Sequence, residues 1–251
     1  MENHQRDAVI GNSGAPFVTD LARRCGTASD YRVVGRPSLP NYIGATSGSA
    51  QGISDDLGPS SHPLAVDNVF RQVRASGRVV RTFAESMPSA CTLVGSGRYA
   101  VKHNPAAYYV GGTDRDACSH EDVPLGTTTS GPMADAINGG TLPTFTLVIP
   151  NLCNDMHDCS VQTGDAWLRD WVSRLTSGPD YHAGKTAIFV VWDEPTPMPF
   201  LAVAPSIKPG SRTGTALDHY ALLRTTEELL GLPTTLGTAR TAPSLRPLLH
   251  L

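Results

Sequence analysis

The sequence lacks an excess of basic residues, a long apolar segment and a paired-cysteine metal motif. Its 251 residues carry a net charge of −3, so it has no broad basic footprint of the kind that binds nucleic acid nonspecifically. No apolar run approaches the roughly 20 residues that span a bilayer. The polar start from Met1 to Asp7 does not resemble a signal peptide. As printed, the chain is expected to stay in the cytoplasm, without a membrane span and without nucleic-acid binding.

Cysteine is scarce, and its spacing leaves two interpretations open. No CxxC pair occurs, which disfavours a zinc site. Cys153 and Cys159 lie close together in a stretch rich in loop formers, and Cys91 and Cys118 bracket another such region. One interpretation is two disulfides with Cys25 left over, which is natural in an oxidising compartment; the other is five reduced thiols, some of them buried.

Glycine (24) and proline (20) are spread along the whole chain rather than gathered in a linker, which indicates many turns and favours one domain over residues 1–251. Apolar runs predict strands at Thr144–Ile149, Thr186–Trp192, Phe200–Ala204 and Val79–Ala84. Helical spacing predicts helices at Ala15–Arg24, Asp165–Leu175 and Leu217–Leu230. The alternation favours an α/β fold with a largely parallel sheet between helices. Ligands bind beyond the carboxyl ends of such strands, so the residues after each strand matter most.

Two adjacent carboxylates, Asp193 and Glu194, follow the apolar run Ile188–Trp192. Unpaired carboxylates are costly to bury, so such a pair at a strand end requires a cation, a basic partner or solvent. A hard metal ion suits carboxylate oxygens. The competing interpretation is that Asp193 caps a turn before Pro195 while Glu194 faces water.

Ser38 stands at the start of a segment that predicts a helix running to Gly48, with proline in its first turn. Its hydroxyl would lie near the free N–H groups and the positive dipole end of that helix, where a phosphoryl group binds well. A metal ion beside it could lower the pKa of the hydroxyl and make it a nucleophile. A simple helix-capping serine is the alternative interpretation.

A loop rich in asparagine and aspartate, residues 151–159, follows the strand that ends at Ile149 and contains His157. A neutral histidine can bind metal, and a protonated one can neutralise phosphate oxygens or protonate a leaving group. An ordinary polar surface turn is the alternative. His103, before a turn, and His219, at a predicted helix start, would by themselves be surface or capping residues.

Taken together, these stretches resemble the phosphoesterase family of the alkaline-phosphatase superfamily, and within it the secreted bacterial acid phosphatases. The resemblance covers essentially the whole chain, because several motifs occur in the family's order. They are Glu2-Asn3-His4, Pro37-Ser38-Leu39-Pro40-Asn41-Tyr42, His103-Asn104-Pro105, Gly140-Thr141-Leu142-Pro143, Asn154-Asp155-Met156-His157-Asp158, Trp192-Asp193-Glu194 and His219-Tyr220. Their order is more specific than any one of them.

The resemblance implies a three-layer α/β/α sandwich that hydrolyses phosphate monoesters of small substrates through a phosphoserine intermediate on Ser38. One divalent cation would be held by Glu2, Asn3, Ser38, Asp193 and Glu194. Oxygen ligands of this kind suit calcium, magnesium or manganese better than zinc. The phosphate pocket would be lined by His103, His157 and His219, and the substrate would also meet Arg36, Asn41 and Asp158.

The chain departs from the family pattern at two places that affect the site. Relatives carry an apolar first strand before the Glu-Asn pair, whereas Met1 stands there, so the first strand is expected to be missing. Relatives usually have histidine where this chain has Arg36, which can grip phosphate but cannot exchange a proton near neutral pH. Family members are usually exported, which implies a secreted or periplasmic protein.

Two other functions compete with the phosphatase interpretation, and the sequence leaves the natural substrate and the oligomeric state open. A phosphodiesterase of phospholipase C type shares the superfamily core, but the short chain without a lipid-binding extension favours a monoester substrate. A non-catalytic remnant that binds phosphate or metal is suggested by the missing strand and by Arg36.

Overall fold

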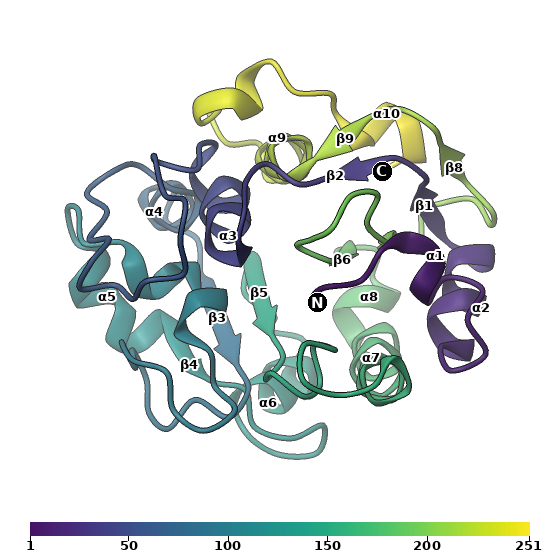
Figure 1. Cartoon of the computed structure of the whole chain (residues 1–251), viewed down its shortest axis with the longest axis horizontal. Coiled ribbons are helices and arrows are strands. Elements are labelled where there is room, and N and C mark those ends of the chain that lie inside the picture. Colours follow the sequence, from purple (N-terminus) through teal and green to yellow (C-terminus); the bar gives the residue numbers. More distant parts are fainter.

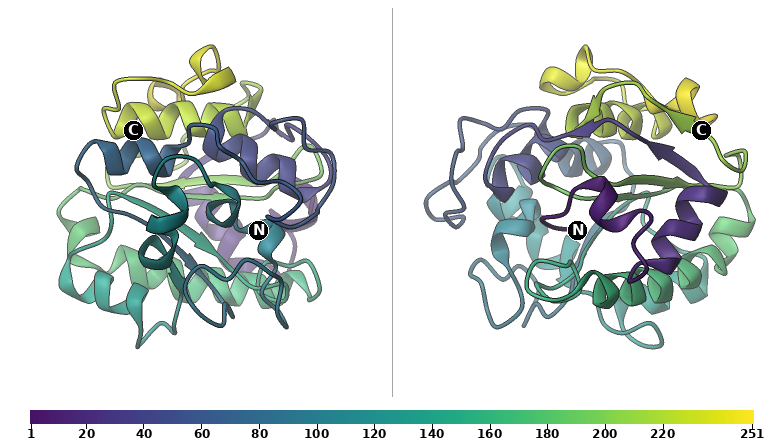
Figure 2. Two further views of the ribbon diagram at one scale, coloured as in Figure 1. Left: turned by 90° about the vertical axis from the view of Figure 1, so that its left-hand side faces the viewer. Right: turned by 45° about the vertical axis from the view of Figure 1, so that its right-hand side comes forward.

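Helices cover both faces of a layer of strands in the computed structural model, which describes residues 1–251 (Figure 1, Figure 2). The strands are β1 (Gly26–Ala28), β2 (Tyr31–Arg32), β3 (Val80–Ala84), β4 (Asp122–Pro124), β5 (Phe145–Ile149), β6 (Ile188–Val191), β7 (Phe200–Val203), β8 (Arg212–Thr213) and β9 (Leu217–Asp218). The α-helices are α1 (Arg6–Val9), α2 (Pro16–Arg24), α3 (Ser38–Ser47), α4 (Val69–Ala75), α5 (Asp114–Glu121), α6 (Pro132–Gly139), α7 (Val161–Thr176), α8 (Pro179–His182), α9 (His219–Leu229) and α10 (Leu245–Leu249). Three short 3-10 helices are η1 (Val101–His103), η2 (Pro105–Tyr108) and η3 (Gly237–Arg240). The α/β fold class is confirmed, and no helix is long and apolar enough to cross a membrane.

The strands form two larger sheets and one short pair. The first sheet has the order β6-β7-β1-β8, the second has the order β4-β3-β5, and β2 pairs with β9. In the second sheet β3 runs parallel to both neighbours, whereas β6 and β7 are antiparallel. The expectation of a largely parallel sheet was therefore wrong for β6 and β7. Their connection, from Val191 to Phe200, is shorter than the dozen or so residues that a parallel crossover needs.

All four predicted strands are confirmed as β3, β5, β6 and β7, and the predicted helices correspond to α2, α3, α7 and α9. Two helix starts differ from prediction for local reasons. α9 begins at His219 because Leu217 and Asp218 pair with β2, and the Asp218 side chain accepts a hydrogen bond from the Ala221 N–H at 2.9 Å. α7 begins at Val161 because the Ser160 side chain caps it.

The layers are held together by two large apolar clusters. One contains 22 buried residues, including Trp192 and Phe200, and joins α2 and α7 to the β6-β7-β1 region. The other contains 19, including Ile43 and Val73, and packs α3, α4 and α9 against β3 and β5. A buried carboxylate fixes the entry to α2, because Asp165 accepts hydrogen bonds from the N–H groups at the start of that helix.

β5 and β6 are each the edge strand of their sheet, and the N-terminus lies between them in Figure 1. The residues after both strands and the first residues of the chain are thereby brought to one place. That the apolar first strand of relatives is missing from this chain stays a prediction.

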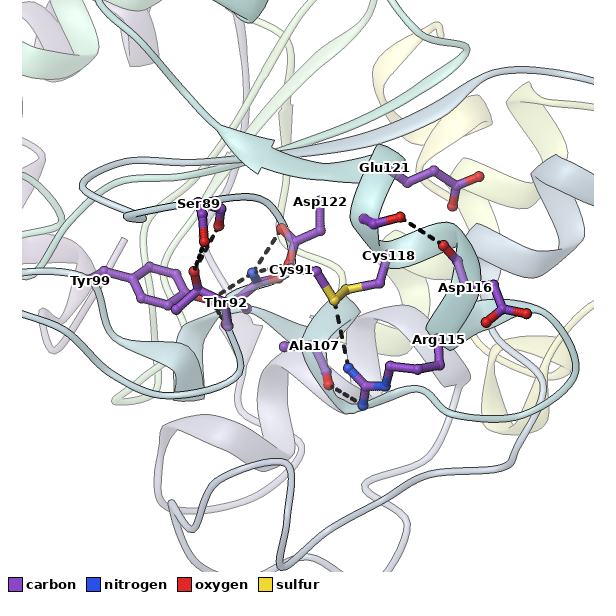
Figure 3. The surroundings of a disulfide bond; sticks show 12 residues. Ser89, Cys91, Thr92, Tyr99, Ala107, Arg115, Asp116, Cys118, Glu121 and Asp122 are labelled. Carbon is purple, nitrogen blue, oxygen red and sulfur yellow. Dashed lines mark hydrogen bonds between the residues drawn. A yellow bond between two sulfur atoms is a disulfide. The ribbon is translucent and has the colours of Figure 1, made fainter.

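The interpretation with two disulfides is confirmed. Cys91 is bonded to Cys118, and Cys153 to Cys159, across sequence separations of 27 and 6 residues, and Cys25 is free. Figure 3 shows the first bond joining the loop after β3 to α5. The second closes the loop that carries His157.

Asp122, beside the first disulfide (Figure 3), should make the stability of the fold depend on pH. It is fully buried, and burial raises its pKa from 3.8 to about 7 although two hydrogen bonds from Asn104 oppose the shift. The folded state therefore holds a proton that the unfolded state has lost, and this stabilisation disappears as pH rises through about 7. Between about pH 5 and about pH 8 the loss is roughly 2 to 3 kcal/mol.

We expect Asp122→Asn to remove that part of the pH dependence, because an amide does not titrate. Denaturant unfolding of both proteins at the two pH values measures it. Asp116→Asn, which changes an exposed acid on α5, the helix just before Asp122, is the control and should leave the wild-type pH dependence in place. A stability difference between wild type and Asp122→Asn that is equal at both pH values would contradict the prediction.

Candidate active site

The first residues of the chain lie beside the end of β6 (Figure 1). The backbone nitrogen of Met1 donates to the Val191 carbonyl at 3.1 Å, and the Asp193 N–H donates to the Met1 carbonyl at 3.1 Å. The Glu2 N–H donates to the Asp155 carbonyl at 2.8 Å. These backbone bonds hold Glu2 between β6 and the loop after β5.

The Glu2 carboxylate is fully buried and joins two other elements. Its Oε2 accepts a hydrogen bond from Ser38 Oγ at 3.2 Å, its Oε1 accepts one from the Tyr42 hydroxyl, and His103 Nε2 lies 3.3 Å from Oε1. Burial raises the pKa of Glu2 well above its usual value, and the charge of Asp193 raises it further. A cation placed here would stabilise the ionised form.

Ser38 is the first residue of α3, and 2% of its surface is exposed. The helix tolerates Pro40 in its first turn, where no N–H is needed, and it ends at Gly48, whose φ of 74° favours glycine. The capping interpretation of Ser38 was wrong, because Pro37 is the residue at the cap and no side-chain capping bond is made. The Ser38 hydroxyl is directed to Glu2 instead.

Asp56 ties the start of α3 to the segment that carries His103. Its Oδ1 accepts from the Leu39 N–H at 3.0 Å, and its Oδ2 accepts from Lys102 Nζ at 2.9 Å. One N–H at the positive end of α3 is therefore already paired with an anion. Sequence reasoning missed Asp56, because it lies in a loop with no periodic pattern and far from both partners in the chain.

Asp193 and Glu194 lie where β6 ends, as predicted. Asp193 is 3% exposed; its Oδ1 accepts from the Asn3 N–H at 3.4 Å, and its Oδ2 has no hydrogen-bond partner. Glu194 is partly exposed, and burial followed by the charge of Asp193 raises its pKa. A buried carboxylate with an unpaired oxygen, close enough to Glu2 for its charge to raise the Glu2 pKa, fits a divalent cation, which prefers oxygen ligands.

The three predicted histidines occupy two different environments. His103 and His219 are buried, and burial lowers the pKa of both, so both imidazoles are neutral near pH 7. His157 is exposed and lies at 6.0 Å from His103 between ring centroids. The Nδ1 atom of His219 lies 3.1 Å from the Tyr31 hydroxyl, and its Nε2 has no partner.

The side chains of the three residues predicted to contact substrate differ in exposure and in their hydrogen bonds within the protein. Arg36 is exposed. Asp158 Oδ1 lies 2.7 Å from His157 Nδ1, so Asp158 orients that imidazole. Asn41 is fully buried, and its amide bonds to backbone groups of residues 34, 35 and 37. In this structure Asn41 therefore shapes the loop before Ser38, and its contact with substrate stays a prediction.

Glu85, directly after β3, anchors the loop that carries His157. Its carboxylate accepts from the Asn151 N–H at 2.9 Å, from the Asn154 amide at 2.9 and 3.0 Å, and from Trp167 Nε1 at 3.2 Å. Glu85 was missed, although the rule that residues after strands matter most pointed to it. Tyr42 and Asp155 were also missed, although both stand inside motifs that carry the family resemblance.

Comparison with known proteins decides the family. The model of the Phosphoesterase family matches residues 3–233. The chain belongs to the phosphoesterase family. A phosphatidylinositol-3-phosphatase of Mycobacterium tuberculosis is 32% identical over 97% of this chain and 79% of that protein.

The phosphoesterase also has fungal relatives. A probable acid phosphatase of Kluyveromyces lactis is 24% identical over 93% of this chain and 57% of that protein, and a phosphate-repressible acid phosphatase of Penicillium chrysogenum is 24% identical over 86% and 54%. The chain spans only somewhat more than half of these two proteins. Together with the family match, these relatives make the chain a hydrolase that acts on phosphoric ester bonds.

Solved structures support the fold of this phosphoesterase. A protein of the alkaline phosphatase superfamily from Vibrio parahaemolyticus superposes with a TM-score of 0.65 at 12% identity, covering 98% of this chain and 69% of that one. Ps i-CgsB in complex with a neocarrahexaose superposes with a TM-score of 0.63 at 14% identity, covering 98% and 74%. At such identities the likeness concerns the fold alone, and it confirms the alkaline-phosphatase-like architecture.

Proposed function

We propose that this phosphoesterase hydrolyses phosphate monoesters, with Ser38 as nucleophile and one divalent cation as cofactor. The observation that carries the proposal is the contact of Ser38 Oγ, at the start of α3, with the buried carboxylate of Glu2 beside Asp193. The residues that would hold the cation are Glu2, Asn3, Ser38, Asp193 and Glu194. When bound, the cation would lower the pKa of the Ser38 hydroxyl and balance phosphoryl charge.

The chain's own residues account for the two displacements. Ser38 Oγ attacks phosphorus while its proton passes to Glu2 Oε2, to which the hydroxyl already donates. The bond to the leaving oxygen breaks, and His157 protonates that oxygen, because it alone of the three histidines is exposed and it is held by Asp158. Water then attacks the phosphoserine and gives a proton to His157, the bond from phosphorus to Ser38 Oγ breaks, and Glu2 returns its proton to that oxygen, which releases phosphate and restores the hydroxyl. Because the transition state is loose, positioning and charge balance supply most of the rate.

The exposed cation Arg36 beside the site favours a substrate that carries a second anionic group. The charge of Arg36 acts to lower the pKa of Glu194, so Arg36 lies within electrostatic reach of that carboxylate, whereas Lys102, which acts in the same sense, is already paired with Asp56. The phosphorylated inositol lipid named for the mycobacterial relative has such a second group. We therefore include a phosphoinositide among the substrates to be assayed.

We also propose that the protein acts in an oxidising compartment, as a secreted or periplasmic enzyme. The two disulfides support this, because such bonds persist where thiols are not kept reduced.

Turnover on a simple aryl phosphate and on its bis-aryl diester tests the proposed reaction. We expect kcat/KM for the monoester to exceed that for the diester by at least about tenfold, which corresponds to roughly 1.4 kcal/mol of transition-state stabilisation. A preparation purified in parallel from cells without the gene is the control for contaminating phosphatases. Faster diester cleavage would favour an enzyme of phospholipase C type, and no cleavage of either would favour a non-catalytic remnant.

A further inference from the structure

Three buried side chains that could bind a metal ion converge beside the nucleophile. They are Glu2, His103 at the end of η1, and Asp155 in the loop after β5, and their exposed fractions are 0%, 1% and 1%. One ligand atom from each lies within 4.8 Å of the others. Of these three residues, the resemblance assigns a metal-binding role to Glu2 alone, and His103 would add a nitrogen ligand at this place.

Three polar atoms of this group, both His103 nitrogens and Asp155 Oδ2, make no hydrogen bond within the protein. His103 Nδ1 lies 3.2 Å from Asp155 Oδ2, and His103 Nε2 lies 3.3 Å from Glu2 Oε1, but neither pair makes an aligned hydrogen bond. The large majority of buried polar side-chain atoms in proteins are hydrogen-bonded. His103 Nδ1 and Asp155 Oδ2 face each other, so His103 Nε2 is the buried atom without an aligned partner that indicates a ligand.

The arrangement matches the way that proteins orient a metal-binding histidine. Such a histidine uses one ring nitrogen for the metal and gives the N–H of the other to a carboxylate. Asp155 faces Nδ1, which leaves Nε2 directed toward Glu2. Asp155 is itself fixed, because its Oδ1 accepts from the His157 N–H at 2.7 Å and its N–H donates to the Asn151 carbonyl at 2.8 Å.

We propose that His103 is a metal ligand through Nε2, with Asp155 as the carboxylate that orients its ring. The inference rests on the proposed function, because Glu2 belongs to both ligand sets. It also changes the choice of metal. A set with an imidazole nitrogen among oxygens suits manganese, iron or zinc, whereas oxygen ligands alone suit calcium or magnesium equally well.

Pulsed electron paramagnetic resonance of the protein loaded with Mn²⁺ alone tests the nitrogen ligand, because a directly bound imidazole gives a nitrogen coupling to the metal. We expect this coupling in the wild type, in His157→Gln and in His219→Gln, and its loss in His103→Gln. In Asp155→Asn the coupling should remain while Mn²⁺ affinity falls about 10- to 100-fold. The ratio of Mn²⁺ to Mg²⁺ affinity, measured by calorimetry, should be higher in the wild type than in His103→Gln.

Bound Mn²⁺ without nitrogen coupling in the wild type would overturn the inference and leave the proposed function standing. Coupling that survives in His103→Gln and disappears in His157→Gln or His219→Gln would also overturn it. A wild type that binds no Mn²⁺ but still hydrolyses phosphate esters would contradict the proposed cofactor as well. Circular dichroism of each variant establishes that it is folded, and the wild-type spectrum keeps the inference testable if His103→Gln does not fold.

Discussion

Replacement of Ser38 by alanine should abolish turnover and leave the fold intact. The hydroxyl is the atom proposed to bond to phosphorus, and no other hydroxyl donates to Glu2 Oε2. Loss of a nucleophile removes the covalent route altogether, so kcat should fall on the order of a thousandfold or more. The cost to stability should be only about 1 to 3 kcal/mol, because one hydrogen bond to a buried carboxylate is lost. Steady-state kinetics and denaturant unfolding measure the two effects separately.

Ser47→Ala is the matched control for that experiment. Ser47 is also buried, at the other end of α3, and its hydroxyl donates to backbone carbonyls of Ile43 and Ser49. It should lose a comparable amount of stability and keep wild-type turnover. Acid quenching of the wild type during turnover, followed by mass spectrometry, should locate a phosphoryl group on Ser38. Residual activity of Ser38→Ala above about a tenth of wild type would show that Ser38 is not the nucleophile. Such a residue of activity corresponds to a loss of less than about 1.4 kcal/mol of transition-state stabilisation.

Removal of divalent metal should inactivate the enzyme by at least about a hundredfold, because a bound cation contributes several kcal/mol of charge stabilisation in such sites. Without a cation, no positive charge at Glu2 and Asp193 balances the phosphoryl group, and the raised pKa of Glu2 favours its protonated form, which cannot take the Ser38 proton. Dialysis against a chelator, measurement of residual metal, and separate addition of Mn²⁺, Mg²⁺, Ca²⁺ and Zn²⁺ make up the experiment. The melting temperature should also rise when metal is added, because the cation binds the folded state.

Two variants distinguish the metal site from a general effect of the chelator. Asp193→Asn should weaken metal binding and require more added metal for activity. Asp170→Asn, which changes an exposed acid on α7 paired with Arg169, should respond to chelation as the wild type does. Full activity of a protein in which metal analysis finds no bound metal would refute the metal dependence.

Secondary structure was predictable where the apolar pattern was strong. The run Ile188–Trp192 has no polar residue, so both the strand and the position of Asp193 at its end followed directly. The pairing of that strand did not follow, because an apolar run is the same for a parallel and an antiparallel neighbour. Only the short connection to Phe200 limited the choice, and its consequence was not recognised in the sequence.

The sequence alone determined the family, the fold class, the helix that begins at Ser38 and the carboxylate pair after β6, because these depend on local pattern and motif order. Only the tertiary structure decided that Tyr42 and His103 meet at Glu2, that Asp56 joins Leu39 to Lys102, and that Glu85 holds the loop of His157. The physical reason is that these contacts link residues far apart in the chain. Their distances depend on which strand edges face each other and on how the helices pack. The local pattern of apolar residues does not predict either arrangement. The proposed nitrogen ligand His103 belongs to this second group.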